Sequence, residues 1–240
     1  EAFTACDEEA WKNYPGAMKN QGDWAFAMGI NRFLYHTFVH RAHGIQYPPG
    51  ITLGAWGSHW DRSQTWWPMA SGYHRYISRC QYILSQGTPV AEVLYLSPEG
   101  APNVFKSPAS ATEGTAVLSD KKGYSFDGCS PAHLMEHAEV SGHRIVFPGG
   151  ASYSLLVLPC YETMTPALLA KIESLVNAGA RVVGRPPVKS PSLTNYPACD
   201  EQVAAMAKKM WGALEVPAEM TARSYSRGAL FYGGKLCVLD

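Results

Sequence analysis

The stretch from Gly29 to Gln86 constrains the fold more than any other part of the sequence, because a short apolar segment there runs into a long aromatic loop and then a helix. Residues 30–38 are rich in branched and aromatic side chains and predict a strand buried on both faces, as in a parallel sheet. Apolar residues recur every three or four positions over 66–84 and predict an amphipathic helix. Strand, loop and helix in this order are typical of an α/β barrel, whose loops carry the site.

Residues from Pro89 onward alternate between predicted strands and helices, which favours a doubly wound, mostly parallel α/β sheet. Ser130 before Pro131, and Thr165 before Pro166, are each an N-cap followed by proline at the first helical position. The fold class is therefore α/β, with a domain boundary at 87–89. Strands are predicted at 90–96, 143–148, 153–159 and 180–184, helices at 130–139, 165–179 and 200–211, and a terminal hairpin at 230–239 turning at Gly233-Gly234.

Composition excludes several classes of protein. The 240 residues carry no formal net charge, so nothing favours a nucleic-acid partner. No apolar run approaches the roughly 18 residues of a membrane span. The six cysteines form no C-x-x-C pair, which argues against zinc clusters and redox dithiols. The chain starts at Glu1 without Met, so we expect it to begin inside a longer protein; its localisation is open, and a periplasmic or extracellular site is compatible with it.

The loop between the predicted strand and helix has the side chains of a carbohydrate site. The stretch 29–86 holds five of the eight histidines and four of the seven tryptophans. The C–H faces of a sugar stack on indole rings, and its hydroxyls need donors and acceptors. We take Trp56, His59 and Trp60 as candidate sugar contacts, next to Asp61 and Arg62. The alternative is a packed loop, with the tryptophans buried and the two charges paired at the surface.

Other candidates come from the histidines and from the first residue. His36 is a candidate donor to sugar hydroxyls, although a structural role explains it equally well, and His40, Arg41 and His43 are weaker candidates. Glu1 is a candidate for one of the two carboxyl groups that glycosidases place on either side of the scissile bond.

With these residues in view, the sequence resembles glycoside hydrolase family 106, the α-L-rhamnosidase family. The stretches that carry the resemblance cover most of residues 1–210. They are EAFTA at 1–5, GDWAFAMGINRFLYHTFVH at 22–40, PGITLGAWGSHWDRSQTWWPMASGYHRYISRCQYIL at 49–84, LYLSPEGAPNVF at 94–105, GYSFDGCSP at 123–131 and YSLLVLPCYETMTPALLAKIESLVNAGARVVG at 153–184.

The resemblance implies a (β/α)8 barrel that hydrolyses terminal α-L-rhamnosides with inversion, with rhamnose-containing glycosides or oligosaccharides as its partners. Residues 1–88 would be the last part of that barrel, and 89–240 an incomplete flavodoxin-like or glutamine-amidotransferase-like domain. Glu1 would be the catalytic base, whereas the general acid would lie on an earlier strand outside this chain, so the chain alone would be inactive. The resemblance also implies calcium at the sugar site, and the sequence shows no run of carboxylates that identifies its ligands.

Two alternatives from other functional classes stay open. The aromatic loop could belong to a non-catalytic module that binds carbohydrate or a protein. Cys160 follows a predicted strand, where an amidotransferase-like fold would place a nucleophile. Its neighbours Pro159 and Tyr161 are not the small residues that a sharp nucleophile turn needs, which argues against an amidohydrolase.

Overall fold

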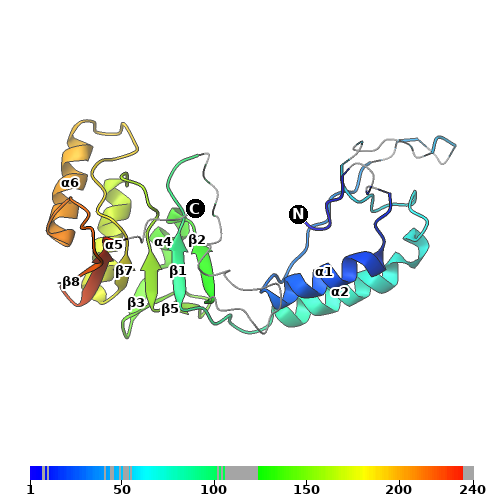
Figure 1. Cartoon of the computed structure of the whole chain (residues 1–240), viewed down its shortest axis with the longest axis horizontal. Helices are drawn as coiled ribbons and strands as arrows, with labels where there is room; N and C mark the ends of the chain where they lie inside the picture. Colours follow the sequence, from blue (N-terminus) through cyan, green and yellow to red (C-terminus); the bar gives the residue numbers. More distant parts are fainter. Residues whose placement is uncertain are drawn as a thin grey trace. The chain divides into compact units, whose positions relative to one another are not determined.

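The computed structural model describes residues 1–240 except 7, 8, 10, 41, 44, 45, 49, 51–53, 55, 102, 104, 106–123 and 235–240. The chain divides into two compact units, Glu1–Gly87 and Thr88–Asp240, which are described separately (Figure 1). Within the described residues, no helix is long and apolar enough to span a bilayer.

Two helices that lie side by side form the base of the first unit (Figure 1). Helix α1 (Pro15–Ala27) begins with proline, a residue that favours the first helical position because its N–H would have no partner there. A 3-10 turn, η2 (Trp67–Met69), leads into α2 (Ala70–Leu84), so the predicted amphipathic helix is confirmed. Its buried stripe is Ala70, Tyr73 and Ile77.

The predicted strand over 30–38 is not a regular strand in the structure. Its one β-bridge joins Tyr35 to Ala2, and its other backbone contacts are irregular: the N–H of Phe33 donates to the side-chain Oε1 of Gln81 at 2.7 Å. An extended segment becomes a regular strand only when neighbours pair with it along its length. Apolar composition predicted the extended segment and could not predict how much of it would be paired.

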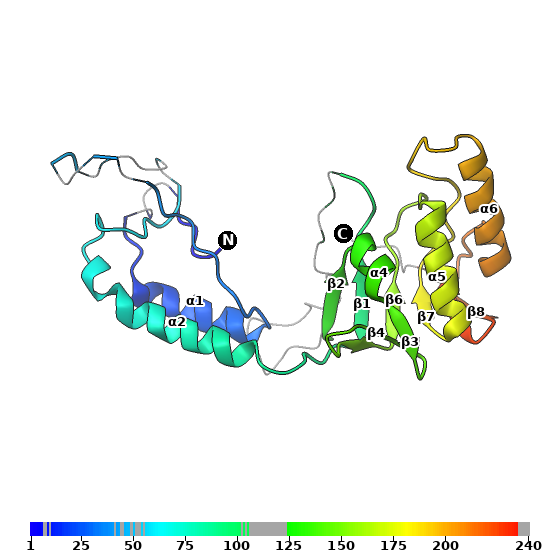
Figure 2. The ribbon, with the colours of Figure 1, turned by 180° about the vertical axis from the view of Figure 1, so that it is seen from behind.

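The second unit is built on a six-stranded sheet in which all neighbouring strands run parallel except one antiparallel pair at an edge. The α/β class is therefore confirmed. Helices α4 (Pro131–His137) and α5 (Pro166–Ala178) lie on one face of this sheet (Figure 2), and α5 packs against α6 (Ala198–Trp211). The spatial order of the strands is β2 (Phe126–Cys129), β1 (Val93–Leu96), β6 (Leu155–Val157), β7 (Arg181–Val183), β9 (Gly228–Tyr232) and β8 (Thr221–Tyr225).

A smaller antiparallel sheet, in the order β3 (Glu139–Ser141), β4 (Arg144–Val146) and β5 (Ser152–Tyr153), completes the unit. The residues predicted as one strand at 143–148 belong to this sheet and not to the main one. Prolines and caps at the helix ends agree with prediction: Ser130 Oγ accepts from the N–H of His133, and Thr165 Oγ1 accepts from the N–H of Leu168.

The predicted hairpin over 230–239 is wrong. Strand β9 already has β7 on one side and β8 on the other, so no position beside it is left for a following strand. The hairpin partner is the preceding strand, and the chain turns at Ser226, whose φ of 52° is left-handed. Residues 235–240 lie outside the described residues.

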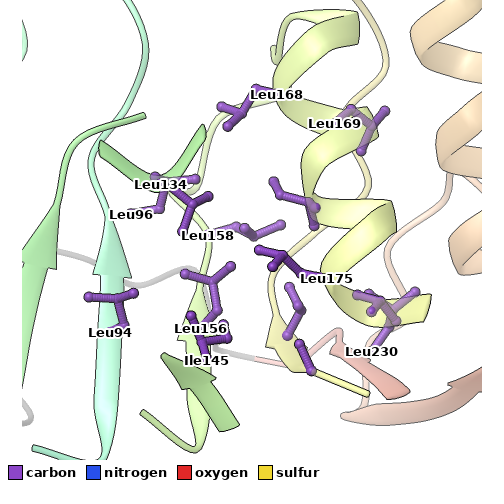
Figure 3. Close-up of a cluster of buried hydrophobic side chains, with 14 of the residues drawn as sticks. Leu94, Leu96, Leu134, Ile145, Leu156, Leu158, Leu168, Leu169, Leu175 and Leu230 are labelled. Atoms are coloured by element: carbon purple, nitrogen blue, oxygen red, sulfur yellow. The ribbon is translucent and has the colours of Figure 1, made fainter. Parts of the chain in front are cut away.

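Leucines of α5 fill the space between helix and sheet (Figure 3). Leu169 and Ile172 are fully buried, as are Leu156 of β6 and Leu230 of β9. Complete burial of one such side chain stabilises a fold by about 1.5–3 kcal/mol, so this layer is the main stabilising feature of the second unit.

Candidate functional site

Three extended segments of the first unit meet at one place and form the frame of the candidate site. The N–H of Ala2 donates to the carbonyl of Leu34 at 2.7 Å, and that of Gly57 donates to Ala5 at 2.6 Å. Residues 36–37 and 58–60 pair directly: Thr37 donates to Ser58 at 3.0 Å, and Trp60 donates back to Thr37 at 3.1 Å. These hydrogen bonds hold the two segments side by side outside any regular strand.

Buried polar groups lock the frame. Ser58 is inaccessible to solvent, and its Oγ donates to the carbonyl of Phe3 at 2.6 Å while accepting from Asn13 Nδ2 at 2.9 Å. The indole N–H of Trp66 donates to the carbonyl of Asn13 at 2.9 Å. Because buried polar groups are costly unless they are paired, these contacts favour one arrangement of the segments.

Glu1 and His36 each adjoin one residue of the bridge between Ala2 and Tyr35. Glu1 is exposed and precedes Ala2, whose bridge partner Tyr35 is followed by His36. His36 is half-buried, and Gly57 approaches it so closely that a Cβ at position 57 would lie 2.6 Å from its Nδ1. Glycine at 57, with φ of 84°, therefore permits the loop to pack against the histidine.

The predicted aromatic contacts separate into an exposed ring and two buried ones. Trp56 is 58 % exposed, whereas His59 and Trp60 are 0 % and 3 % exposed. Trp60 stacks on Tyr35 with ring centroids 4.1 Å apart, and His59 lies 3.9 Å from the ring centroid of Trp11. Trp56 is thus placed where a ligand could reach it, while His59 and Trp60 pack inside the unit; their predicted contact with sugar stays a prediction.

The environment of Trp60 perturbs two titratable neighbours. Burial raises the pKa of the Tyr35 phenol to about 12 and lowers the pKa of His74. Both rings contact Trp60, with centroid distances of 4.1 and 5.5 Å. Neutral forms of both groups are therefore favoured at pH 7, which suits an uncharged aromatic core.

A pocket of about 410 Å³ lies beside this core. It is lined by residues that directly follow the hydrogen-bonded segments and by the first residue of η2. These residues are Phe38, Val39, His40, Asp61, Arg62 and Trp67. Sequence analysis assigned Trp67 to a helix stripe and considered His40 only weakly. Their place in the sequence could have identified them, because residues that follow neighbouring parallel segments meet at one edge, where those segments have their carboxyl ends. His43 is exposed and accepts from Arg62 at its carbonyl, and Arg41 lies outside the described residues.

A metal site is not evident from the side chains. In the part of the chain that the structure describes, no group of three or more His, Cys, Asp or Glu residues converges as metal ligands would. Calcium prefers six to eight oxygen ligands. The calcium that the family resemblance implies stays a prediction, and no step below depends on it.

In the second unit, the strand order reverses between β1 and β6, and a side-chain contact lies at this point. Glu99 follows β1, and its carboxylate accepts from the N–H and hydroxyl of Thr165 at 2.7 and 2.6 Å, at the start of α5. Helix N-termini attract anions, and here Glu99 provides a carboxylate from within the chain. The residue that an amidotransferase fold would use, Cys160, lies close by in sequence, just after β6.

The histidines of the second unit contact aromatic rings and a backbone carbonyl. His133 stacks on Phe147 with centroids 5.1 Å apart and meets the ring of His137, while His143 Nδ1 contacts the carbonyl of Gly179 at 3.2 Å. A thiol nucleophile needs a base that is held by a third group. The contacts of these histidines give the amidohydrolase alternative no support.

Comparisons with known proteins agree with the resemblance seen in the sequence. The chain is 36 % identical over 214 residues to a protein of Formosa agariphila named "Putative beta-glucuronidase", covering 88 % of this chain and 17 % of that protein. It also matches the solved structure of a rhamnosidase from Novosphingobium sp. PP1Y, with a TM-score of 0.71 and 26 % identity over 99 % of this chain and 21 % of the other. The chain thus spans about a fifth of each relative's length. A sequence model of the α-L-rhamnosidase family, glycoside hydrolase family 106, matches residues 1–239, and the chain belongs to this family.

Proposed function

We propose that the chain is part of a glycoside hydrolase that releases terminal α-L-rhamnose with inversion of the anomeric centre. The observation that supports the proposal is the position of Glu1, an exposed residue that directly precedes Ala2, the bridge partner of Tyr35. Membership of the α-L-rhamnosidase family supports the reaction class.

In this mechanism Glu1 takes a proton from a water molecule, which attacks the anomeric carbon on the face opposite the leaving group. The leaving oxygen takes its proton from a general acid in a part of the full-length protein outside this chain. An inverting enzyme holds its two carboxyl groups roughly 6.5–9.5 Å apart so that the water fits between them. The chain alone would bind sugar weakly and would not hydrolyse it, because half of the acid/base pair is absent.

The proposal also covers the two units. We take Glu1–Gly87 as the last part of a (β/α)8 barrel, supported by the hydrogen bonds between residues 36–37 and 58–60 and by the pocket that follows these residues. The second unit is proposed as a flavodoxin-like module, because the parallel strands β2-β1-β6-β7-β9 follow the spatial order 2-1-3-4-5 of that class. With Glu99 in the crevice, this module has a structural role.

The test is hydrolysis of an aryl α-L-rhamnoside by the full-length protein and its Glu1→Gln variant. Loss of a general base lowers kcat by about 10²–10⁴-fold, and the thermal unfolding temperature should stay unchanged because Glu1 is exposed. Azide, which needs no base, should restore turnover of the variant and give the β-configured glycosyl azide.

Glu201→Gln is the matched control, since Glu201 is exposed in the first turn of α6. An active protein with an equally active Glu1→Gln variant would remove Glu1 from the mechanism. A folded protein that binds rhamnose and hydrolyses no glycoside would favour the non-catalytic binding module.

A further inference from the structure

Helix α4 of the second unit carries a pattern of metal-binding side chains that the proposed hydrolysis does not use. Residues 133–137 read His-Leu-Met-Glu-His, the H-x-x-E-H order in which one class of zinc enzymes places two histidine ligands. Such a pattern has meaning only on a helix, where residues four apart lie on the same face. All five residues lie within α4, so His133 and His137 share one face.

The two imidazoles meet on that face. Their ring centroids lie 4.8 Å apart, with an angle of 66° between the ring planes. Zinc binds an imidazole nitrogen at about 2.0–2.1 Å, so two nitrogens that share one ion lie no more than about 4 Å apart. Rings in contact reach this spacing by small rotations of their side chains, and no change of the backbone is needed.

The structure also holds one ring of the pair in place. His133 stacks on Phe147 with centroids 5.1 Å apart and an angle of only 11° between the planes. Stacking uses the face of the imidazole, whereas a metal binds a nitrogen at the edge of the ring. His133 is therefore oriented before an ion arrives, which reduces the conformational entropy that is lost on binding.

Glu136 places a negative charge beside the pair. Its Oε2 lies 3.5 Å from Nε2 of His137, and its side chain is largely exposed. A carboxylate next to a ligating histidine orients the ring and increases its basicity. The charge also favours a cation at this face of the helix over an anion.

A pocket of about 370 Å³ lies beside the two histidines and is lined by both of them. Two protein ligands leave two of the four positions around a zinc ion for water or a small ligand, and the pocket has the space for them. A catalytic zinc site uses three protein ligands. Among the described residues no third side chain converges on this pair, so we assign metal binding here and no reaction.

We propose that His133 and His137 bind one divalent transition-metal ion such as Zn²⁺ at the edge of this pocket, with Glu136 stabilising its charge. Imidazole is a preferred ligand of zinc and copper, whereas calcium and magnesium prefer oxygen ligands. The site is separate from the proposed glycosidase chemistry, which uses residues of the first unit, and either can fail without the other.

Isothermal titration calorimetry of the full-length protein with Zn²⁺ tests the proposal, with Ca²⁺ in excess so that sites built from oxygen ligands are already filled. His133→Phe keeps the stacking on Phe147 and removes the nitrogens, and His137→Gln removes the second ring. Each should weaken binding at least about tenfold, since loss of an outer-shell partner alone costs roughly 10- to 100-fold. Glu136→Gln should have a smaller effect in the same direction.

His143→Asn is the matched control, because it removes another imidazole of the second unit. Asn also tolerates the left-handed φ of 64° at this position. Unchanged affinity in this variant, together with the losses in His133→Phe and His137→Gln, supports the site. Binding that is equal in wild type and in both of these variants overturns it. An equal loss in all variants, the control included, also overturns it and indicates adventitious binding to surface histidines.

Cu²⁺ gives a second readout that does not depend on the stability of a variant. With one equivalent of Cu²⁺, the electron paramagnetic resonance spectrum of the wild-type protein should show coupling to two imidazole nitrogens. A spectrum without nitrogen coupling would refute the proposal by itself. Circular dichroism identifies a variant that fails to fold, and His133→Gln then replaces His133→Phe.

Discussion

Tryptophans that are close in the sequence have different roles in the first unit. Trp60 stacks on Tyr35 and meets Trp66 edge to face with centroids 5.4 Å apart, so it belongs to the core. Trp56 is exposed, with its backbone bridged to Cys6, and has the accessibility of a ligand contact. The loop composition showed that the rings were important and could not show which of them faces inward.

We expect Trp60→Ala to destabilise the first unit by about 3–5 kcal/mol, the usual cost of removing a buried tryptophan. Trp56→Ala should leave stability unchanged to within about 0.5 kcal/mol, as for exposed positions. Chemical denaturation of the full-length protein, followed by near-UV circular dichroism, checks both values. Equal stability of the two variants would contradict the different burial of the rings.

Helix α5 shows how one element is stabilised at both its ends and along its side. Thr165 caps its N-terminus and is itself bound by Glu99, and Gly179 with φ of 121° ends it. In the middle, Glu173 Oε1 accepts from Lys209 Nζ of α6 at 2.8 Å and from the hydroxyl of Tyr225 of β8 at 2.5 Å. The caps could be predicted from Thr-Pro and glycine, whereas the contacts with α6 and β8 depend on the tertiary fold.

Glu99→Ala should destabilise the second unit by about 1–3 kcal/mol, because the N–H and hydroxyl of Thr165 then lose a charged partner. Thr165→Ala should cost a similar amount, and the double variant should cost less than the sum of the single ones, since both remove the same contact. Urea unfolding of the four proteins checks this. Strict additivity would show that the two residues do not act together.

The stability that Glu173 contributes should depend on pH. Burial raises the pKa of this carboxyl, but the hydrogen bonds from Lys209 and Tyr225 outweigh burial and hold its pKa below the ordinary value of 4.5. A carboxyl with a lowered folded-state pKa stabilises the fold above the unfolded-state pKa and loses this effect as the pH falls through the folded-state pKa.

Glu173→Gln should therefore cost about 1 kcal/mol at pH 7, a modest value because Lys209 is largely exposed. The difference between wild type and variant should shrink below about pH 4.5. Urea unfolding at pH 7, 5 and 3.5 tests the trend. A difference that stays constant down to pH 3.5 would argue against an ionic contribution.

At the scale of the whole molecule, the second unit was predicted from sequence far better than the first. Its helices and most parallel strands have local signals, namely caps, prolines, glycines and apolar runs. The signal failed at β2, because Phe126-Asp127-Gly128-Cys129 lacks the branched residues typical of strands, and at the terminal hairpin. In the first unit the frame of the site depends on pairings between residues that are distant in sequence, which no local pattern contains.

Because each unit is compact by itself, we expect a defect in one to leave the other folded. Trp211 is fully buried, its indole N–H donates to Gly184 at 3.0 Å, and its carbonyl accepts from Tyr232. Trp211→Ala should destabilise the second unit by about 3–5 kcal/mol and lower its unfolding temperature.

At temperatures below that transition, kcat/KM of the full-length protein for an aryl rhamnoside should stay within about twofold of wild type, as expected for a residue that takes no part in the proposed chemistry. Differential scanning calorimetry and limited proteolysis report the unfolding, and initial rates report the activity. A large loss of kcat/KM by a folded variant would show that the second unit takes part in catalysis.

The contact between Glu99 and Thr165 has a consequence for how this protein responds to its surroundings. A helix N-terminus that binds a free anion gains stability with the logarithm of the anion's concentration, so such a fold weakens when its ligand is scarce. Here the anion is attached to the chain, and its effective concentration is set by covalent connection and not by supply. The stability that this contact contributes therefore does not vary with the supply of a free anion.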